Sequence, residues 1–400
     1  MKDQSPLPLP SHLAPPLHLL LLTVRDTTNP DVSAALDTAV GKNPDWDAFV
    51  ETAARHSLSS LALRGLRRCS AAVPDAILER LRQQSMRAAG RALAQRSEIA
   101  RIVPIFERAG IRLLLFKGTV LSQQLYGDPY ARSANDIDIL VGPAQLEAAH
   151  ALLTAEGYRQ AGHAYTAREF ALHRRHIKDL EYVNKSAGVL LELHHRLSDN
   201  PHLLSCDFAT LFSARTHVQI NANRTATLPP DLLPLYLCVH GASHGWVRLI
   251  WLVDFAASLQ NSTAEQALKA ADRFGLRPLM LHGLLLAHFW LGTAPTQNNL
   301  EAARANRHVR ALNRILAALM MRSFGNAAAS TNRLDPREAW LARCYVYMAK
   351  RDWRYWRSQL VRELISPTDW EQLQLPERLF PLYSPYRLFG WLFRKRARRR

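Results

Sequence analysis

The chain has 400 residues, enough for two or three domains of ordinary size. Hydrophobic residues make up 48% of it, so a sizeable core can form, and this argues against disorder throughout the chain. Lys and Arg outnumber Asp and Glu by 51 to 34, and the net charge of +17 favours an anionic partner such as a nucleotide, a nucleic acid or an acidic membrane surface.

Cysteine content and hydropathy narrow the class of protein further. Four widely spaced cysteines with no CxxC pair argue against a disulfide framework and against a structural zinc site. The sequence contains no run of 18 or more apolar residues, so we expect neither a transmembrane helix nor an export signal. A reducing, cytoplasmic location fits these features best.

The first 110 residues are expected to form a loose arm and a helical region. Residues 1–16 contain five prolines, and residues 17–70 show a helical pattern with breaks at two Asn-Pro pairs. A long helix is predicted over 74–109, because its apolar residues recur at spacings of three and four. Gly110 is a natural stop for that helix.

The sequence pattern changes over residues 111–228, where short strand-like and helix-like segments predict a compact α/β unit. Short apolar runs at 111–116 and 136–141 indicate strands, and 118–126 and 143–157 indicate helices. Two further strands, 178–185 and 189–195, are joined by Ser186-Ala187-Gly188, which is typical of a hairpin. The predicted fold is therefore α+β, with a small mixed sheet embedded in a mostly helical protein.

The remaining chain divides into a helical domain over 229–365 and a proline- and aromatic-rich segment over 366–400. This last segment ends in the basic sequence RKRARRR, preceded by several aromatic residues. The combination of positive charge and aromatic side chains predicts peripheral contact with an anionic bilayer or a nucleic acid. A disordered basic end is the alternative.

His173 and His176, which flank two arginines, are interpreted as a solvated or acceptor-facing basic patch rather than a metal site.

The strand over 136–141 carries the most informative pattern, two carboxylates among apolar residues. Side chains alternate faces in a strand, so Asp136 and Asp138 point the same way, roughly 6–7 Å apart. Glu192 is a third acid, alone in the apolar strand VLLELHH. If the two strands are neighbours, these three residues could hold two Mg²⁺ ions, the arrangement used in two-metal phosphoryl transfer. Alternating aspartates on a solvated face remain the alternative.

Lys117 and Gly118 lie where a strand gives way to a helix, a position whose backbone N–H groups can hold a phosphate. Arg132 could contact a triphosphate or pair with an acid and fix the loop. His194 shares a strand face with Glu192 and could approach the same site.

His240 and His244 are four residues apart in an expected helix and so share one face. A metal pair is one interpretation, but no third ligand is evident nearby. Packing against the α/β unit, or lining an acceptor pocket, is the other. Arg248, Trp251 and Asp254 recur every three residues and could form a polar seam.

The sequence LFKGTVLSQQLYGDPYARSANDIDILVGPAQLEAAHALLTAEGY resembles nucleotidyltransferases of the polymerase-beta superfamily. More narrowly, it is similar to a bacterial family of uncharacterised nucleotidyltransferases, and LLELHHRL and HGASHGWVRLIWLVDFA extend the likeness. The resemblance implies a nucleotidyltransferase core in which Asp136, Asp138 and Glu192 bind metal, with Glu192 as candidate general base. It also implies that Lys117 and Gly118 form the nucleotide-phosphate loop, although better-known members carry Gly-Ser there and this chain lacks that serine hydroxyl.

The resulting functional hypothesis is metal-dependent transfer of a nucleoside monophosphate from an NTP to a hydroxyl or phosphate acceptor, which is a small molecule, a protein or an RNA. A second hypothesis is a non-catalytic partner protein in a biosynthetic or surface-assembly complex. A third is a toxin-like nucleotidyltransferase that modifies tRNA.

Overall fold

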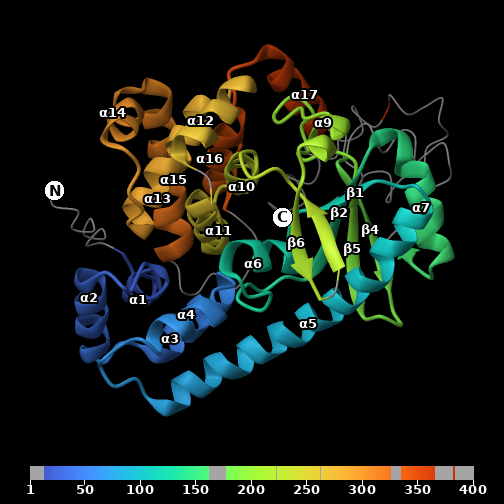
Figure 1. Ribbon diagram of the computed structural model, residues 1–400. Coiled ribbons are helices and arrows are strands. Elements are labelled where there is room, and N and C mark those ends of the chain that lie inside the picture. Colours follow the sequence, from blue (N-terminus) through green and yellow to red (C-terminus); the bar gives the residue numbers. More distant parts are fainter. Residues whose placement is uncertain are drawn as a thin grey trace, which may run out of the picture.

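The computed structural model describes residues 13–161, 177–221, 223–261, 263–325 and 335–364, together with Leu382. Its centre is a five-stranded sheet, and Figure 1 shows helices gathered on either side of it. The histidines at 173 and 176, and all of the basic tail, lie outside the described residues.

The sheet has the strand order β1-β2-β5-β4-β3. Its strands are β1 (Leu113–Leu115), β2 (Asp136–Val141), β3 (Arg159–Gln160), β4 (Asp179–Asn184) and β5 (Val189–His194). The central pair, β2 and β5, is parallel, whereas the other neighbours are antiparallel. The sheet is therefore mixed, as the sequence predicted, and β4 and β5 form the expected hairpin.

The two faces of this sheet differ in chemistry. One face is apolar, and Ile137, Ile139 and Leu191 pack there against α5 (Asp75–Arg108) and α7 (Leu146–Ala155). The opposite face carries Asp138 and Glu192, because side chains alternate along each strand. The acids consequently face away from α5.

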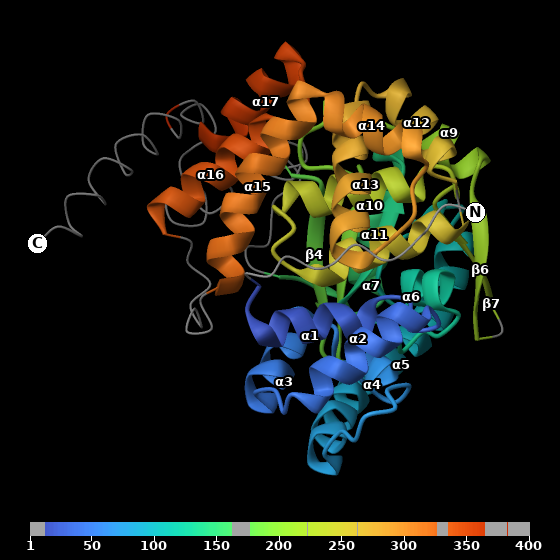
Figure 2. The same cartoon turned by 90° about the vertical axis from the view of Figure 1, so that its left-hand side faces the viewer.

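The helical parts of the protein share a second core. It combines the N-terminal helices with helices beyond residue 229, and Figure 2 shows the first group stacked beneath the second. The N-terminal helices are α1 (Pro15–Val24), α2 (Pro30–Gly41), α3 (Trp46–Arg55) and α4 (Ser59–Leu66). The later ones are α10 (Leu233–Ser243), α11 (Leu249–Asn261), α12 (Ala264–Arg273), α13 (Arg277–Leu291), α14 (Gln297–Ala305), α15 (Arg307–Gly325), α16 (Pro336–Tyr347) and α17 (Trp353–Leu364). The domain boundaries at 111, 229 and 366 stay predictions.

Several elements of the described chain were not anticipated from the sequence, including a hairpin and a 3-10 turn. A separate hairpin of β6 (Thr216–Ile220) and β7 (Asn223–Thr227) follows α9 (Phe208–Ser213). The helix predicted over 143–157 begins as a short 3-10 turn, Pro143–Gln145, before α7. None of the helices in the described part of the chain combines the length and apolarity needed to cross a membrane.

Candidate active site

Asp138 and Glu192 lie directly opposite each other on the parallel strands β2 and β5. Both strands pair without a bulge at this point, so both side chains leave the same face of the sheet. His194 follows Glu192 by two residues and shares that face. Each of the three residues offers a ligand atom within 4.8 Å of those of the other two, a spacing suited to one metal ion.

An ammonium and an imidazole contact the Asp138 carboxylate. The Lys117 ammonium donates to Oδ1 of Asp138 at 2.7 Å, and Nε2 of His194 lies 3.0 Å from the same oxygen. Nε2 of His194 is also 3.0 Å from Oε2 of Glu192. Asp138 is 1% exposed, so these contacts supply the compensation that a buried charge requires.

The pKa values of the cluster reflect this compensation. Burial alone would raise the pKa of Asp138, but the positive charge of Lys117 and the hydrogen bond from His194 bring it well below its usual range. Burial opposes charge on Lys117 too, yet Asp138 holds the pKa of that ammonium well above its usual value. The two residues therefore form a buried ion pair at neutral pH.

Asp136 lies two residues before Asp138, half-buried on the same strand face. Burial, together with the negative charges of Asp138 and Glu192, raises its pKa to about 6. The Asp136 carboxylate thus interacts electrostatically with both other acids. The structure brings the three predicted acids to one sheet face, and it adds His194 to Asp138 and Glu192.

Gly118 begins α6 (Gly118–Tyr126) directly after Lys117. Its φ of +59° is a conformation that favours glycine, and a Cβ there would lie 3.0 Å from the backbone oxygen of Asp136. The glycine thereby allows the start of α6 to lie against β2. This close approach places Lys117 over the acids.

Arg132 lies in the loop before β2, and its Nε donates to Oδ2 of Asp254 on α11 at 2.6 Å. Tyr126 donates its hydroxyl to the other carboxylate oxygen of Asp254 at 2.7 Å. Arg132 and Asp254 are both buried, so this pair ties the loop that leads to Asp136 to the helical part of the protein. Contact between Arg132 and phosphate stays a prediction.

Asp179 is the acid near the site that sequence reasoning missed. It lies opposite His194 on β4, and its Oδ2 is 3.6 Å from Nδ1 of His194. The sequence contained a pattern that could have identified it. Asp179 and Glu181 alternate in KDLEYVNK as Asp136 and Asp138 do in DIDILV. Lys178 pairs with Asp179, so this neighbour is itself compensated.

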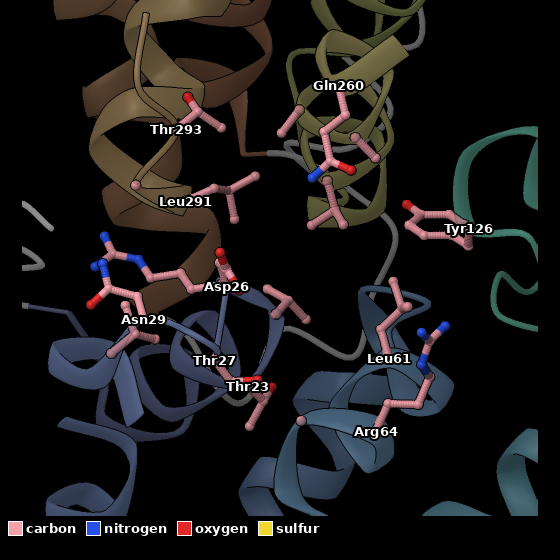
Figure 3. Close-up of a pocket in the computed structure, with 18 of the residues that line it drawn as sticks. Thr23, Asp26, Thr27, Asn29, Leu61, Arg64, Tyr126, Gln260, Leu291 and Thr293 are labelled. Atoms are coloured by element: carbon pink, nitrogen blue, oxygen red, sulfur yellow. The ribbon is translucent and has the colours of Figure 1, made fainter. Parts of the chain in front are cut away.

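A cavity of about 730 Å³ lies elsewhere, between α1, α4, α11 and α13 (Figure 3). Arg64 and Tyr126 line one side of it, and Leu291 and Thr293 line another. None of the three acids contributes to its lining. Tyr126, which lines the cavity, also donates its hydroxyl to Asp254.

The residues present fit a divalent cation. Oδ2 of Asp138 is buried and has no hydrogen-bond partner among the described residues, so one carboxylate oxygen remains available as a ligand. Two carboxylates and an imidazole form a donor set that divalent ions accept, and the Asp136 carboxylate lies on the same face. The cluster could therefore hold a metal ion.

A small mixed sheet that presents paired acids beside a glycine-containing strand-to-helix turn fits the nucleotidyltransferase core that the sequence resemblance implies. A family model described as an uncharacterised nucleotidyltransferase matches residues 42–292, which is more than half of the chain. The chain therefore belongs to this family, as the sequence resemblance predicted. A comparison with curated proteins finds no match.

Proposed function

We propose that the protein transfers a nucleoside monophosphate from an NTP to a hydroxyl or phosphate acceptor, with divalent metal bound at the acidic face of the sheet. The observation that carries this proposal is the direct pairing of Asp138 with Glu192, with Asp136 on the same face. Family membership supports the general class of enzyme.

Asp136, Asp138 and Glu192 would hold two Mg²⁺ ions, and His194 would complete the ligand set at Asp138 and Glu192. When bound, the metal would neutralise phosphate charge and lower the pKa of an attacking oxygen. Glu192 is the most exposed of the three residues in the ligand cluster and would accept the proton of the acceptor hydroxyl. The acceptor oxygen then bonds to the α-phosphorus, and the bond from that phosphorus to pyrophosphate breaks.

Lys117 and Gly118 would hold the phosphates of the NTP at the start of α6. The Lys117 ammonium is already at the acidic face, 2.7 Å from Asp138 and 4.0 Å from Glu192. A cation in this position can attract the triphosphate, and backbone N–H groups at the helix start can hold it. The Lys-Gly turn would thus take the role of the Gly-Ser turn in better-known members.

The test is transfer of label from each of the four NTPs, labelled at the α-phosphate, to acceptors in a cell extract with Mg²⁺. We expect the wild type to label one class of acceptor, and Asp136→Asn and Asp138→Ala to abolish the labelling. Asp75→Asn, an exposed aspartate at the start of α5, is the matched control and should retain activity. Unchanged incorporation by Asp136→Asn would refute the proposed role of the acids.

One observation favours the non-catalytic alternative. Lys117 and His194 already contact Asp138, so this buried carboxylate has polar partners without an added ion. A partner protein that has lost catalysis could retain such an ion pair in place of metal. Calorimetry distinguishes the two functions, because only the enzyme is expected to bind an NTP in a Mg²⁺-dependent manner.

A further inference from the structure

A row of ring contacts leads from the acidic face of the sheet to α10. The ring of Phe116, next to Lys117, lies edge-on to His194 with centroids 5.0 Å apart. It also lies edge-on to Tyr236 of α10 at 5.3 Å. Tyr236 stacks in turn on His240, one helical turn later, at 6.0 Å. These contacts place α10 beside the candidate active site.

Three rings gather at the outer end of this row, namely His240, His244 and Trp251. The centroid distances are 4.8 Å between the imidazoles, 5.5 Å from His240 to Trp251 and 4.9 Å from His244 to Trp251. His244 is exposed, whereas His240 and Trp251 are half-buried. The trio therefore presents ring surface to solvent, unlike Phe116 and Tyr236, which are buried in the core.

Among the described residues, no hydrogen-bond partner is found for the ring nitrogens of this trio. Within the described ranges, the side chains of His240, His244 and Trp251 make ring contacts but no hydrogen bonds. The two histidines also do not join a third metal-ligating residue among the residues described. The metal-pair interpretation of His240 and His244 thus gains no support, and their polar atoms are free to meet a ligand.

Both imidazoles are uncharged at neutral pH. Burial lowers the pKa of His240 well below its usual value, and the positive charge of Lys117 lowers it further. The part of the His244 ring that packs against protein is desolvated, which lowers the pKa of His244 as well; Asp199 opposes this shift, whereas Lys117 and Lys178 add to it. Lys117 thus acts on both imidazoles. Neutral imidazole and indole rings are suited to stacking on an uncharged heterocycle.

We propose that His240, His244 and Trp251 form the platform on which the base of the NTP stacks. This inference rests on the proposed nucleotidyl transfer, since it assigns the base of the same donor whose phosphates lie at Lys117 and the acids. The triphosphate would occupy the acidic face, and the nucleoside would extend along α10 toward the three rings. Stacking makes the platform tolerant of base identity, because every base has a π face.

The test is calorimetric titration of the full-length protein, with Mg²⁺, against the four NTPs and against inorganic tripolyphosphate. We expect at least one NTP to bind more tightly than tripolyphosphate. Trp251→Ala and, separately, His244→Ala should each weaken the binding of that NTP by at least about five-fold. This is the lower end of the effect expected when a base-stacking ring is lost. Affinity for tripolyphosphate should stay within about two-fold, because the variants leave the phosphate region intact.

Two further variants sharpen the result. Trp251→Phe retains an aromatic ring and should restore NTP affinity to near the wild-type value. Trp340→Ala removes an exposed tryptophan of α16 and serves as the matched control, so its NTP affinity should equal that of the wild type. His244 is exposed, so His244→Ala is expected to fold even if Trp251→Ala does not.

Different outcomes separate failure of the platform from failure of the proposed function. If both alanine variants bind the NTP as tightly as the wild type does, the platform is overturned and nucleotidyl transfer stands. Equal affinity of the wild type for NTP and tripolyphosphate also overturns the platform. If the wild type binds no NTP at all, both proposals fail together.

Discussion

The Lys117 ammonium lies 2.7 Å from Oδ1 of Asp138, inside the group of residues that could hold a metal ion. The lysine side chain is 12% exposed and that of the aspartate is fully buried. Removing one partner of such a pair leaves the other charge buried and uncompensated, which is strongly destabilising. The Lys117 ammonium and a metal ion bound at the proposed site would both compensate the charge of Asp138, so loss of one should increase the stabilising effect of the other.

Lys117→Met is expected to lower the free energy of unfolding by about 3 kcal/mol in the absence of divalent ions. Mg²⁺ should restore part of this loss, because a bound cation replaces the missing ammonium at Asp138. The measurement is urea denaturation with and without Mg²⁺. Lys185→Met, at an exposed position after β4, is the control. It should change neither the free energy of unfolding nor the effect of Mg²⁺ on it. An equal Mg²⁺ effect on wild type and Lys117→Met would contradict the dependence.

Glu192→Gln is expected to reduce the rate of nucleotide incorporation by at least about 100-fold, because it removes both a proposed metal ligand and the candidate general base. Glu181→Gln is the matched control. Glu181 lies directly opposite Glu192 on β4 and is exposed, but it is not part of the ligand cluster. Steady-state rates with the NTP and acceptor identified by labelling provide the readout. Comparable losses in the two variants would argue against a specific role for Glu192.

Arg132→Met should cost about 3–5 kcal/mol of stability, because Asp254 would be left buried without its cation. Combining it with Asp254→Asn should recover much of this loss, since the amide oxygen can still accept the Tyr126 hydroxyl. Chemical denaturation of both single variants and the double variant measures the coupling. A double variant no more stable than Arg132→Met would show that the pair is not the main contact of Arg132.

The same double variant tests the predicted contact between Arg132 and phosphate. If the arginine serves only to fix the loop, the refolded double variant should bind the NTP almost as tightly as the wild type. If Arg132 also contacts the triphosphate, affinity should fall although stability is recovered. Calorimetry with NTP and Mg²⁺ separates these two roles.

His282 gives the protein a stability that depends on pH. Burial lowers its pKa to about 3, and nearby His308 acts in the same direction. Below about pH 6.5 the unfolded chain binds a proton that folded His282 does not, so its contribution is full above pH 6.5 and is lost as the pH falls toward 3. The expected slope for one such group is about 1.4 kcal/mol per pH unit.

His282→Gln removes this proton difference and should make stability less dependent on pH between 6 and 4. Urea denaturation at several pH values in this range measures the slopes of wild type and variant. Other buried histidines such as His56 contribute in the same way, so the wild-type slope should exceed that of a single group. Parallel curves for wild type and His282→Gln would contradict the assignment.

The chain itself determined the local features of the site. The alternation of side chains in DIDILV fixed Asp136 and Asp138 on one face, and the same rule placed Glu192 and His194 together. The Lys-Gly step between an apolar strand and a helix likewise predicted where α6 begins. These features depend on neighbours in the sequence, so they could be read without knowledge of the fold.

The tertiary structure decided which distant residues meet. Pairing of β2 with β5 set Asp138 opposite Glu192, and a close approach at Gly118 brought the Lys117 ammonium to Asp138. Arg132 and Asp254 are 122 positions apart, and nothing in either local sequence specifies the other. Strand order, register and buried ion pairs depend on how the whole chain packs and excludes water, which is why local patterns could not predict them.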